Sequence, residues 1–294
     1  MPFIANLSGA NLPITGRDGC GERLLRPLTR VVRGMMRSVE SEEGGAAADP
    51  VGESVVVPGE PWLVTRQREL RGSPGYRGLA LVDRVKRTAY VFQANVAQYQ
   101  AFVAQLQDPG FSLPIMEVKN PGAHDGMLSE AERLLHNVLT ALSTRVDHQR
   151  RFMEKHFAAD IEFTKAYKDN VAATFNGDMQ AVFLKGLRNY MAHRDLPVGQ
   201  SSSTMSATVY EIKLVLPCEP LLRWERWNSD AKSWIERCGA EIDIADVVAD
   251  YARKVEIFDQ WLADQISHKY AVEIQEYRQA HEEYTREHHR VFGL

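Results

Sequence analysis

Helical periodicity over the second half of the chain is the feature that most limits the fold. From Ser129 onward, apolar residues recur every three or four positions, the spacing that forms one face of an α-helix. The longest repeat follows Asp243, which can cap a helix. Its apolar positions are Ile244, Val248, Tyr251, Val255, Phe258, Leu262, Ile266 and Tyr270. Such a chain buries its apolar faces as an antiparallel helical bundle.

Further helices and one strand are expected in the same region. A Ser-x-x-Glu capping box opens a helix over 129–157, and a second helix covers 161–175. After an Asn-Gly break, a third helix is capped by an aspartate and covers 178–191. An alternating run at 208–216 predicts a strand. The expected fold is mainly α: an up-and-down helical bundle over residues 125–294 with a small strand-rich insertion.

The first 115 residues are expected to differ from the bundle. Residues 1–57 indicate an N-terminal extension that contains a basic amphipathic helix and a Gly/Ala/Glu-rich linker. Residues 58–115 indicate a small α+β module, whose helix runs from Val96 to Leu106. Its β-prone runs are 62–65, 79–82 and 88–92.

The basic helix of the extension, residues 23–38, has arginines on one side and apolar residues on the other. Such a helix binds nucleic acid or a membrane surface in some proteins. In others it packs against the rest of the chain with its arginines in water. Both interpretations stay open.

The amino-acid composition excludes several classes of protein. The 294 residues are 44% hydrophobic and 25% charged, as in folded globular proteins. No apolar run reaches the ~20 residues of a membrane span, so integral membrane contact is not expected. Cys20, Cys218 and Cys238 are too scattered for a disulfide framework or a zinc site, which suits the cytoplasm. The net charge of −4 leaves room for a local basic patch, and no phosphate-binding loop or cofactor motif is present, so no cofactor is expected.

The most informative stretch is Lys-Gly-Leu-Arg-Asn-Tyr-Met-Ala-His-Arg-Asp, residues 185–195. Asn189 and His193 are four residues apart and therefore share a helical face. Arg188 lies about 100° round the helix from Asn189 and reaches the same region through its long side chain. No acidic residue occurs from Gln180 to Arg194. The segment is therefore locally cationic within an acidic protein.

Residues Arg188 to His193 resemble the Arg-x4–6-His motif, often with a polar residue after the arginine, of the HEPN superfamily. These proteins are all-helical and usually dimeric, and many are metal-independent ribonucleases in toxin–antitoxin and phage-defence systems. The resemblance covers roughly residues 129–294 and rests on this one motif. It implies that His193 is the acid–base group, that Arg188 holds the phosphate and that Asn189 positions them. Asp195 stands where some members carry a tyrosine that an antitoxin modifies, so that mode of regulation is not implied.

The chemistry suits these roles. Imidazole titrates near neutral pH, so it can take a proton from a ribose 2′-hydroxyl or return one to the leaving 5′-oxygen. Guanidinium binds a phosphate through two hydrogen bonds. Lys185, Tyr190 and Arg194 are the candidate substrate-binding residues. The expected partners are RNA, a second copy of the chain that supplies a second proton-transfer group, and an antitoxin or other regulatory protein.

Two other interpretations of the motif stay open: a catalytically inactive bundle of the same type that binds RNA or a protein, and a chance match. The same spacing recurs from Arg151 to His156. Phe152 stands there where the polar residue belongs, so we interpret that copy as a decoy.

Other histidines and the tryptophans carry less information. Metal binding needs two histidines four residues apart with a third ligand, and the C-terminal histidines lack this pattern, which favours a solvated tail. These are His281, His288 and His289. The tryptophans have helical spacing and apolar neighbours, which favours the core over base stacking. These are Trp224, Trp227, Trp234 and Trp261.

Overall fold

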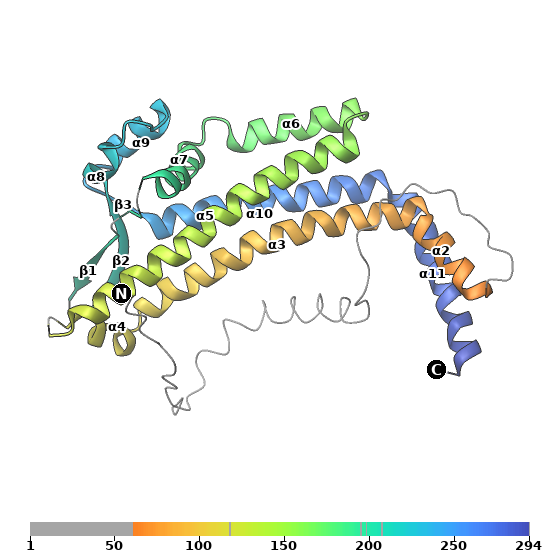
Figure 1. Ribbon diagram of the computed structural model, residues 1–294, viewed down its shortest axis with the longest axis horizontal. Helices are drawn as coiled ribbons and strands as arrows, with labels where there is room; N and C mark the ends of the chain where they lie inside the picture. Colours follow the sequence, from red (N-terminus) through yellow and green to blue (C-terminus); the bar gives the residue numbers. More distant parts are fainter. Residues whose placement is uncertain (1–60, 118, 195, 198, 207, 294) are drawn as a thin grey trace, which may run out of the picture. The chain divides into compact units, whose positions relative to one another are not determined.

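The computed structural model describes residues 61–293 apart from 118, 195, 198 and 207. The expected extension at 1–57, with its basic helix at 23–38, lies outside the described residues. Within them the chain is mostly helical, with one small sheet (Figure 1), so the mainly α class is confirmed. The helices are α2 (Trp62–Gly72), α3 (Pro74–Leu106), α4 (Pro109–Met116), α5 (Pro121–Phe157), α6 (Ile161–Phe175), α7 (Met179–His193), α8 (Cys218–Leu222), α9 (Ser229–Cys238), α10 (Ile244–Lys269) and α11 (Ala271–Phe292). The strands are β1 (Gln200–Met205), β2 (Tyr210–Pro217) and β3 (Glu241–Asp243).

The strands expected between residues 62 and 92 are wrong. The run at 62–65 belongs to α2, and the runs at 79–82 and 88–92 belong to α3. Residues 58–115 therefore form no α+β module in the part described. The physical reason is the spacing of the buried residues, since Leu81, Val85, Phe92, Val96 and Tyr99 lie on one helical face. Burial of that face outweighs the local β-propensity of its Val and Tyr residues.

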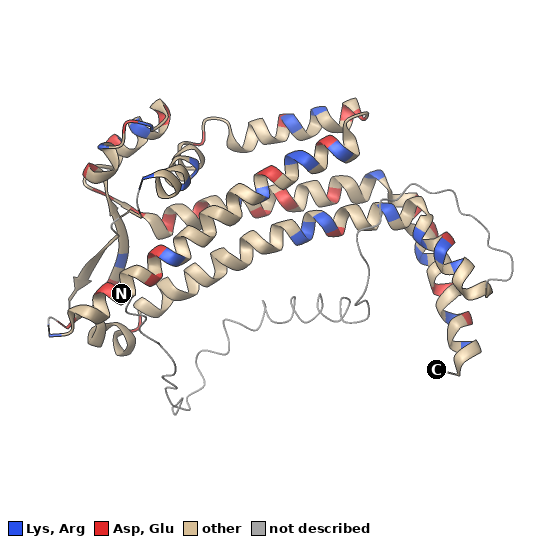
Figure 2. Ribbon diagram, in the orientation of Figure 1, with Lys and Arg blue, Asp and Glu red and all other residues tan. Residues whose placement is uncertain are grey.

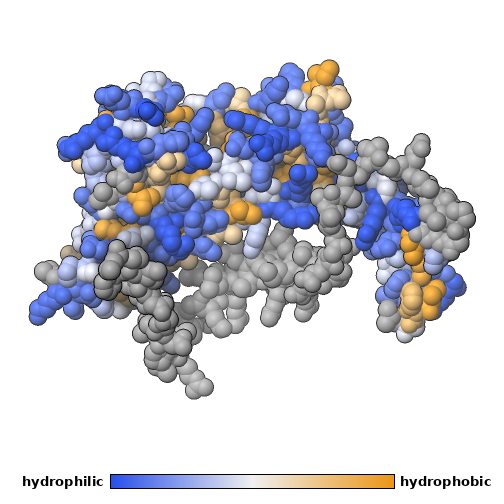
Figure 3. Space-filling view, viewed as in Figure 1, coloured by the Kyte–Doolittle hydropathy of each residue, from blue (hydrophilic) through white to orange (hydrophobic). Residues whose placement is uncertain are grey.

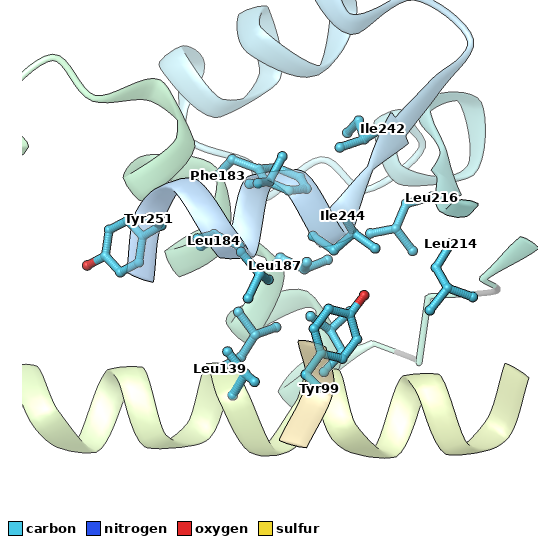
Figure 4. Close-up of a cluster of buried hydrophobic side chains, with 14 of the residues drawn as sticks. Tyr99, Leu139, Phe183, Leu184, Leu187, Leu214, Leu216, Ile242, Ile244 and Tyr251 are labelled. Carbon is cyan, nitrogen blue, oxygen red and sulfur yellow. The ribbon is translucent and has the colours of Figure 1, made fainter. Parts of the chain in front are cut away.

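Three long helices, α3, α5 and α10, hold most of the core, and α3 packs against both of the others. Each contributes to two apolar clusters. The larger cluster includes Tyr99 of α3, Leu139 of α5 and Tyr251 of α10, together with residues of α7 and β2 (Figure 4). The smaller one includes Val85 of α3 and Ile266 of α10. Helices α5 and α10, which lie in the expected bundle, thus share one core with α3, which contains the helix expected for the module.

A buried ion pair lies between α5 and α10. Arg145 Nε donates to Asp259 Oδ2 at 2.8 Å, and Arg145 Nη2 donates to the other carboxylate oxygen. Gln149 Nε2 also donates to Asp259 Oδ1, at 3.1 Å. The side chains of Arg145 and Asp259 are only 3% and 7% exposed. The charges are therefore satisfied by each other rather than by water.

The sheet is antiparallel in the order β1-β2-β3. Its central strand β2 confirms the strand expected at 208–216, shifted by two residues at its start. Buried Ile212, Leu214 and Leu216 alternate along it and join the core. The sheet therefore covers one end of the helices.

The apolar repeat expected from Ile244 to Tyr270 forms helix α10, and a separate helix follows it. Helix α10 ends at Lys269, and α11 begins after Tyr270, which has a non-helical backbone. Helix α11 packs against α2 and the first turns of α3. The approach is close, because a Cβ at Gly75 would lie 2.0 Å from the carbonyl oxygen of Glu273.

Candidate functional site

Helix α7, which carries the Arg-Asn-x-x-x-His motif, is fixed at its N-terminal end. Gly177 has a φ of +77°, which turns the chain after α6. Asp178 then caps the helix, since its Oδ1 accepts a hydrogen bond from the backbone N–H of Gln180 at 3.1 Å. Its Oδ2 pairs with Lys254 Nζ of α10 at 2.7 Å. The cap predicted from the sequence is therefore also an anchor to a core helix.

One face of α7 is buried in the core. Phe183, Leu184 and Leu187 are at most 1% exposed and point into the larger cluster (Figure 4). These residues follow the spacing expected from the sequence. Because this face is buried, the opposite face of α7 is held towards the outside of the protein.

The outward face carries the predicted catalytic residues. Arg188 and Asn189 are half-buried, whereas His193, the last residue of the helix, is exposed. Arg188 Nη1 donates to Asn189 Oδ1 at 3.3 Å. This bond draws the guanidinium towards the side of the helix that Asn189 shares with His193. Arg188 is half-buried, and in the part of the chain that is described its other N–H groups have no hydrogen-bond partner, so they can bind an anion.

The charge of this face is positive. Lys185 is exposed one turn before Asn189, and no acidic residue lies within α7. His193 lies at the C-terminal end of the same helix and is exposed. An anionic polymer would therefore meet Lys185 and Arg188 with a proton donor or acceptor beside them.

The structure places Tyr190 in the core rather than at the surface. It is 6% exposed, with its ring centroid 5.4 Å from that of Trp224 and 6.0 Å from that of Trp227. No face of the ring is left for a nucleobase, so its assignment as a substrate-binding residue is corrected. Exposed Arg194 lies over the same ring, with its Cζ 5.8 Å from the centroid. Of the three candidate substrate-binding residues, Lys185 and Arg194 are accessible.

The tryptophans of the α8–α9 region support α7 from behind. Trp224 and Trp227 are 8% and 7% exposed, so the core interpretation is confirmed for these two. Trp227 Nε1 donates to the carbonyl oxygen of Leu221 at 2.6 Å, which fixes the ring. Gly186 of α7 faces this indole, and a Cβ there would lie 2.5 Å from Trp227 Cζ3. Sequence reasoning gave no role to Gly186, because its requirement comes from a ring 41 positions further along the chain.

Replacing Gly186 by alanine is therefore expected to lower the free energy of unfolding by about 1–3 kcal/mol, the typical cost of overpacking. Gly126 of α5 is a matched control, since nothing lies within 4 Å of the position that a Cβ would take there. At Gly126, replacement by alanine is expected to add roughly 0.5–1 kcal/mol, because alanine favours a helix. Urea unfolding of both variants tests this, and equal shifts of the two midpoints would contradict the packing argument.

In the second Arg-x4-His copy, Phe152 is buried and His156 is half-buried, although Arg151 is exposed. Phe152 is 6% exposed and contacts the ring of His156. Within the described residues, His156 Nε2 is buried without a hydrogen-bond partner. Burial, followed by the positive charges of Arg84 and Lys155, lowers the pKa of His156. These findings agree with the interpretation of this copy as a decoy.

Other kinds of site find no support in the part of the chain that is described. No three His, Cys, Asp or Glu side chains gather there as metal ligands. Nor is any helix there long and apolar enough to cross a membrane. The chain matches no family model, no curated protein and no solved structure. Functional inference therefore rests on the α7 face itself.

Proposed function

We propose that this protein is a metal-independent endoribonuclease of the HEPN type whose site is the outward face of α7. The observation that supports it best is the hydrogen bond from Arg188 to Asn189 on the face shared with His193. An anion-binding group beside an acid–base group on one anchored helix is what the proposed reaction requires. The motif resemblance and the absence of acidic residues in α7 agree with this function.

The proposed reaction is attack of a ribose 2′-oxygen on its own phosphorus. His193 takes the proton of the 2′-hydroxyl, the new O2′–P bond forms and the P–O5′ bond breaks. The leaving 5′-oxygen takes a proton from water. Arg188 binds the non-bridging phosphate oxygens and stabilises the extra negative charge of the pentacoordinate state. The products carry a 2′,3′-cyclic phosphate and a 5′-hydroxyl, and the biological role would be that of a toxin or phage-defence effector.

A second candidate function is a non-catalytic helical scaffold that binds RNA or a protein through the same face. One observation favours it: His193 is the sole imidazole on the outward face of α7, so one chain offers a single side chain for two proton transfers. This scaffold would bind RNA through Lys185 and Arg188 without cleaving it.

Cleavage of total cellular RNA by purified protein in EDTA tests the proposal, with analysis of the fragment ends. We expect cyclic phosphate ends from the unaltered protein. Arg188→Ala is expected to cleave about 10²–10³-fold more slowly, as when one charge-stabilising donor is lost. Arg188→Lys is expected to recover only part of this rate, because ammonium lacks the two-pronged geometry.

Arg151→Ala is the matched control, since Arg151 is an exposed arginine of the decoy copy. It is expected to cleave at the normal rate. RNA that stays intact but is retained in a filter-binding assay would favour the scaffold. Equal cleavage by every variant would place the activity elsewhere.

A further inference from the structure

The C-terminal half of α3 presents an uncharged outward face. From Thr88 to Gln107 the chain contains no charged residue. Figure 2 shows this half of the helix without blue or red, whereas the preceding turns carry both. Positions 91, 94, 98, 101 and 105, three or four residues apart, lie on the side away from the buried stripe; all are exposed except the half-buried Ala94. Tyr90 is exposed beside them, and Gln100, Ala104 and Gln107 are exposed on the flank.

This face has the composition of an interface rather than of a solvated surface. Tyr90 and Val91 are 46% and 52% exposed. On α4, which follows this half of α3, Phe111 and Leu113 are also exposed, at 40% and 45%. Solvated helix faces normally carry charges, so an uncharged stripe about five turns long indicates a partner.

Opposite charges flank the uncharged stretch. Arg87 precedes it and Asp108 follows it, and both are exposed. The three- and four-residue steps begin at Arg87 on α3 and reach Asp108 just beyond its end, where Asp108 is the N-cap of α4. Among the described residues, Arg87 has no ion pair and the Asp108 carboxylate accepts only the cap bond from the Gly110 N–H, so both charges are available.

We infer that this face of α3 binds the same face of a second copy of the chain in an antiparallel arrangement. A two-fold axis between Ala97 and Gln98 is equally far from Arg87 and from Asp108. Each Arg87 then lies opposite Asp108 of the second copy, twice in the dimer, while the uncharged residues meet one another. A parallel pairing would set like charges together. The self-complementary pattern of charges thus favours a second copy as the partner and an antiparallel direction of the two helices.

This dimer goes beyond the proposed ribonuclease function and does not depend on it. Helices α3 and α7 lie on opposite sides of α5 (Figure 1). Pairing through α3 therefore leaves the α7 face open. It differs from the two-fold pairing of motifs that the HEPN resemblance implies, in which α7 would face its own copy. Loss of dimerisation and loss of RNA cleavage are separate measurements.

Sedimentation equilibrium from nanomolar to high micromolar concentration tests the inference. Val91→Glu is expected to raise the dimer Kd about a hundredfold, since two like charges enter an uncharged contact. The matched control is Val291→Glu. Val291 is 57% exposed and lies near the end of α11, a helix other than α3, and Figure 3 shows hydrophobic surface at that end of the molecule. This control is expected to dimerise normally.

A charge exchange tests the direction of pairing. Arg87→Glu is expected to weaken the dimer about tenfold or more, because two carboxylates then meet. Adding Asp108→Lys is expected to restore dimerisation, and circular dichroism checks that loss of the α4 cap leaves the helices intact. A monomeric unaltered protein would overturn the inference. So would a dimer that survives Val91→Glu, that is lost in Val291→Glu, or that the charge exchange fails to restore.

Discussion

Replacement of His193 by alanine is expected to slow RNA cleavage by about 10²–10⁴-fold, the range typical of a lost general acid–base group. The change should leave folding unaltered, because the side chain is exposed at the last position of α7 and makes no hydrogen bond to another described residue. The outward face of α7 still carries Lys185 and Arg188 in this variant, so RNA should still bind. A large loss of rate with little loss of affinity is the pattern that catalysis predicts.

Single-turnover cleavage and RNA affinity, measured on the same preparations, check this prediction. His289→Ala is the matched control, because His289 is an exposed histidine of α11, away from the motif. Thermal unfolding of both variants shows whether either substitution affects stability. If His193→Ala cleaves at the normal rate, imidazole catalysis by α7 is wrong. If it loses affinity in proportion to rate, the residue binds RNA rather than transferring a proton.

The helices were predictable where apolar spacing and caps agree. Asp178 and Asp243 cap α7 and α10 as the sequence indicates, and each carboxylate accepts a hydrogen bond from a backbone N–H of the first turn. The strands expected in α3 fail because local β-propensity is weaker than burial of a helical face. The close packing of Gly75 against α11 could not be predicted, because it arises only in the folded chain.

The candidate site, like the fold, was predictable where it depends on helical spacing. Spacing alone places Asn189 and His193 on one face, and the structure adds the hydrogen bond from Arg188. Tyr190 was a candidate substrate-binding residue, yet its ring packs against Trp227 of a distant segment. Contacts between residues far apart in sequence leave no local pattern, so no periodicity could have revealed them.

The ion pair of Arg145 and Asp259 is a further example, because 114 positions separate its members. Asp259→Ala is expected to lower the free energy of unfolding by about 3–5 kcal/mol, the usual cost of leaving one buried charge unpaired. The guanidinium would lose both carboxylate oxygens, and Gln149 would lose its acceptor. Arg145 also lies 5.8 Å from the ring centroid of Phe258, in surroundings that offer little water.

Urea unfolding measures this loss, and Asp169→Ala is the matched control. Asp169 pairs with Lys165 at 2.8 Å on the surface of α6, where both side chains are more than half exposed. Removing that pair is expected to cost at most about 1 kcal/mol. Comparable losses in the two variants would mean that the buried pair is solvated.

The double variant Arg145→Met with Asp259→Leu separates the cost of an unpaired charge from the value of the pair itself. Well-packed apolar residues often replace a buried ion pair without loss of stability, because no charge then has to leave water. We therefore expect the double variant to recover most of the stability that Asp259→Ala loses. Such recovery would mean that α5 and α10 are held together chiefly by their two apolar clusters. A double variant as unstable as Asp259→Ala would instead show that the ion pair itself contributes to the packing of these helices.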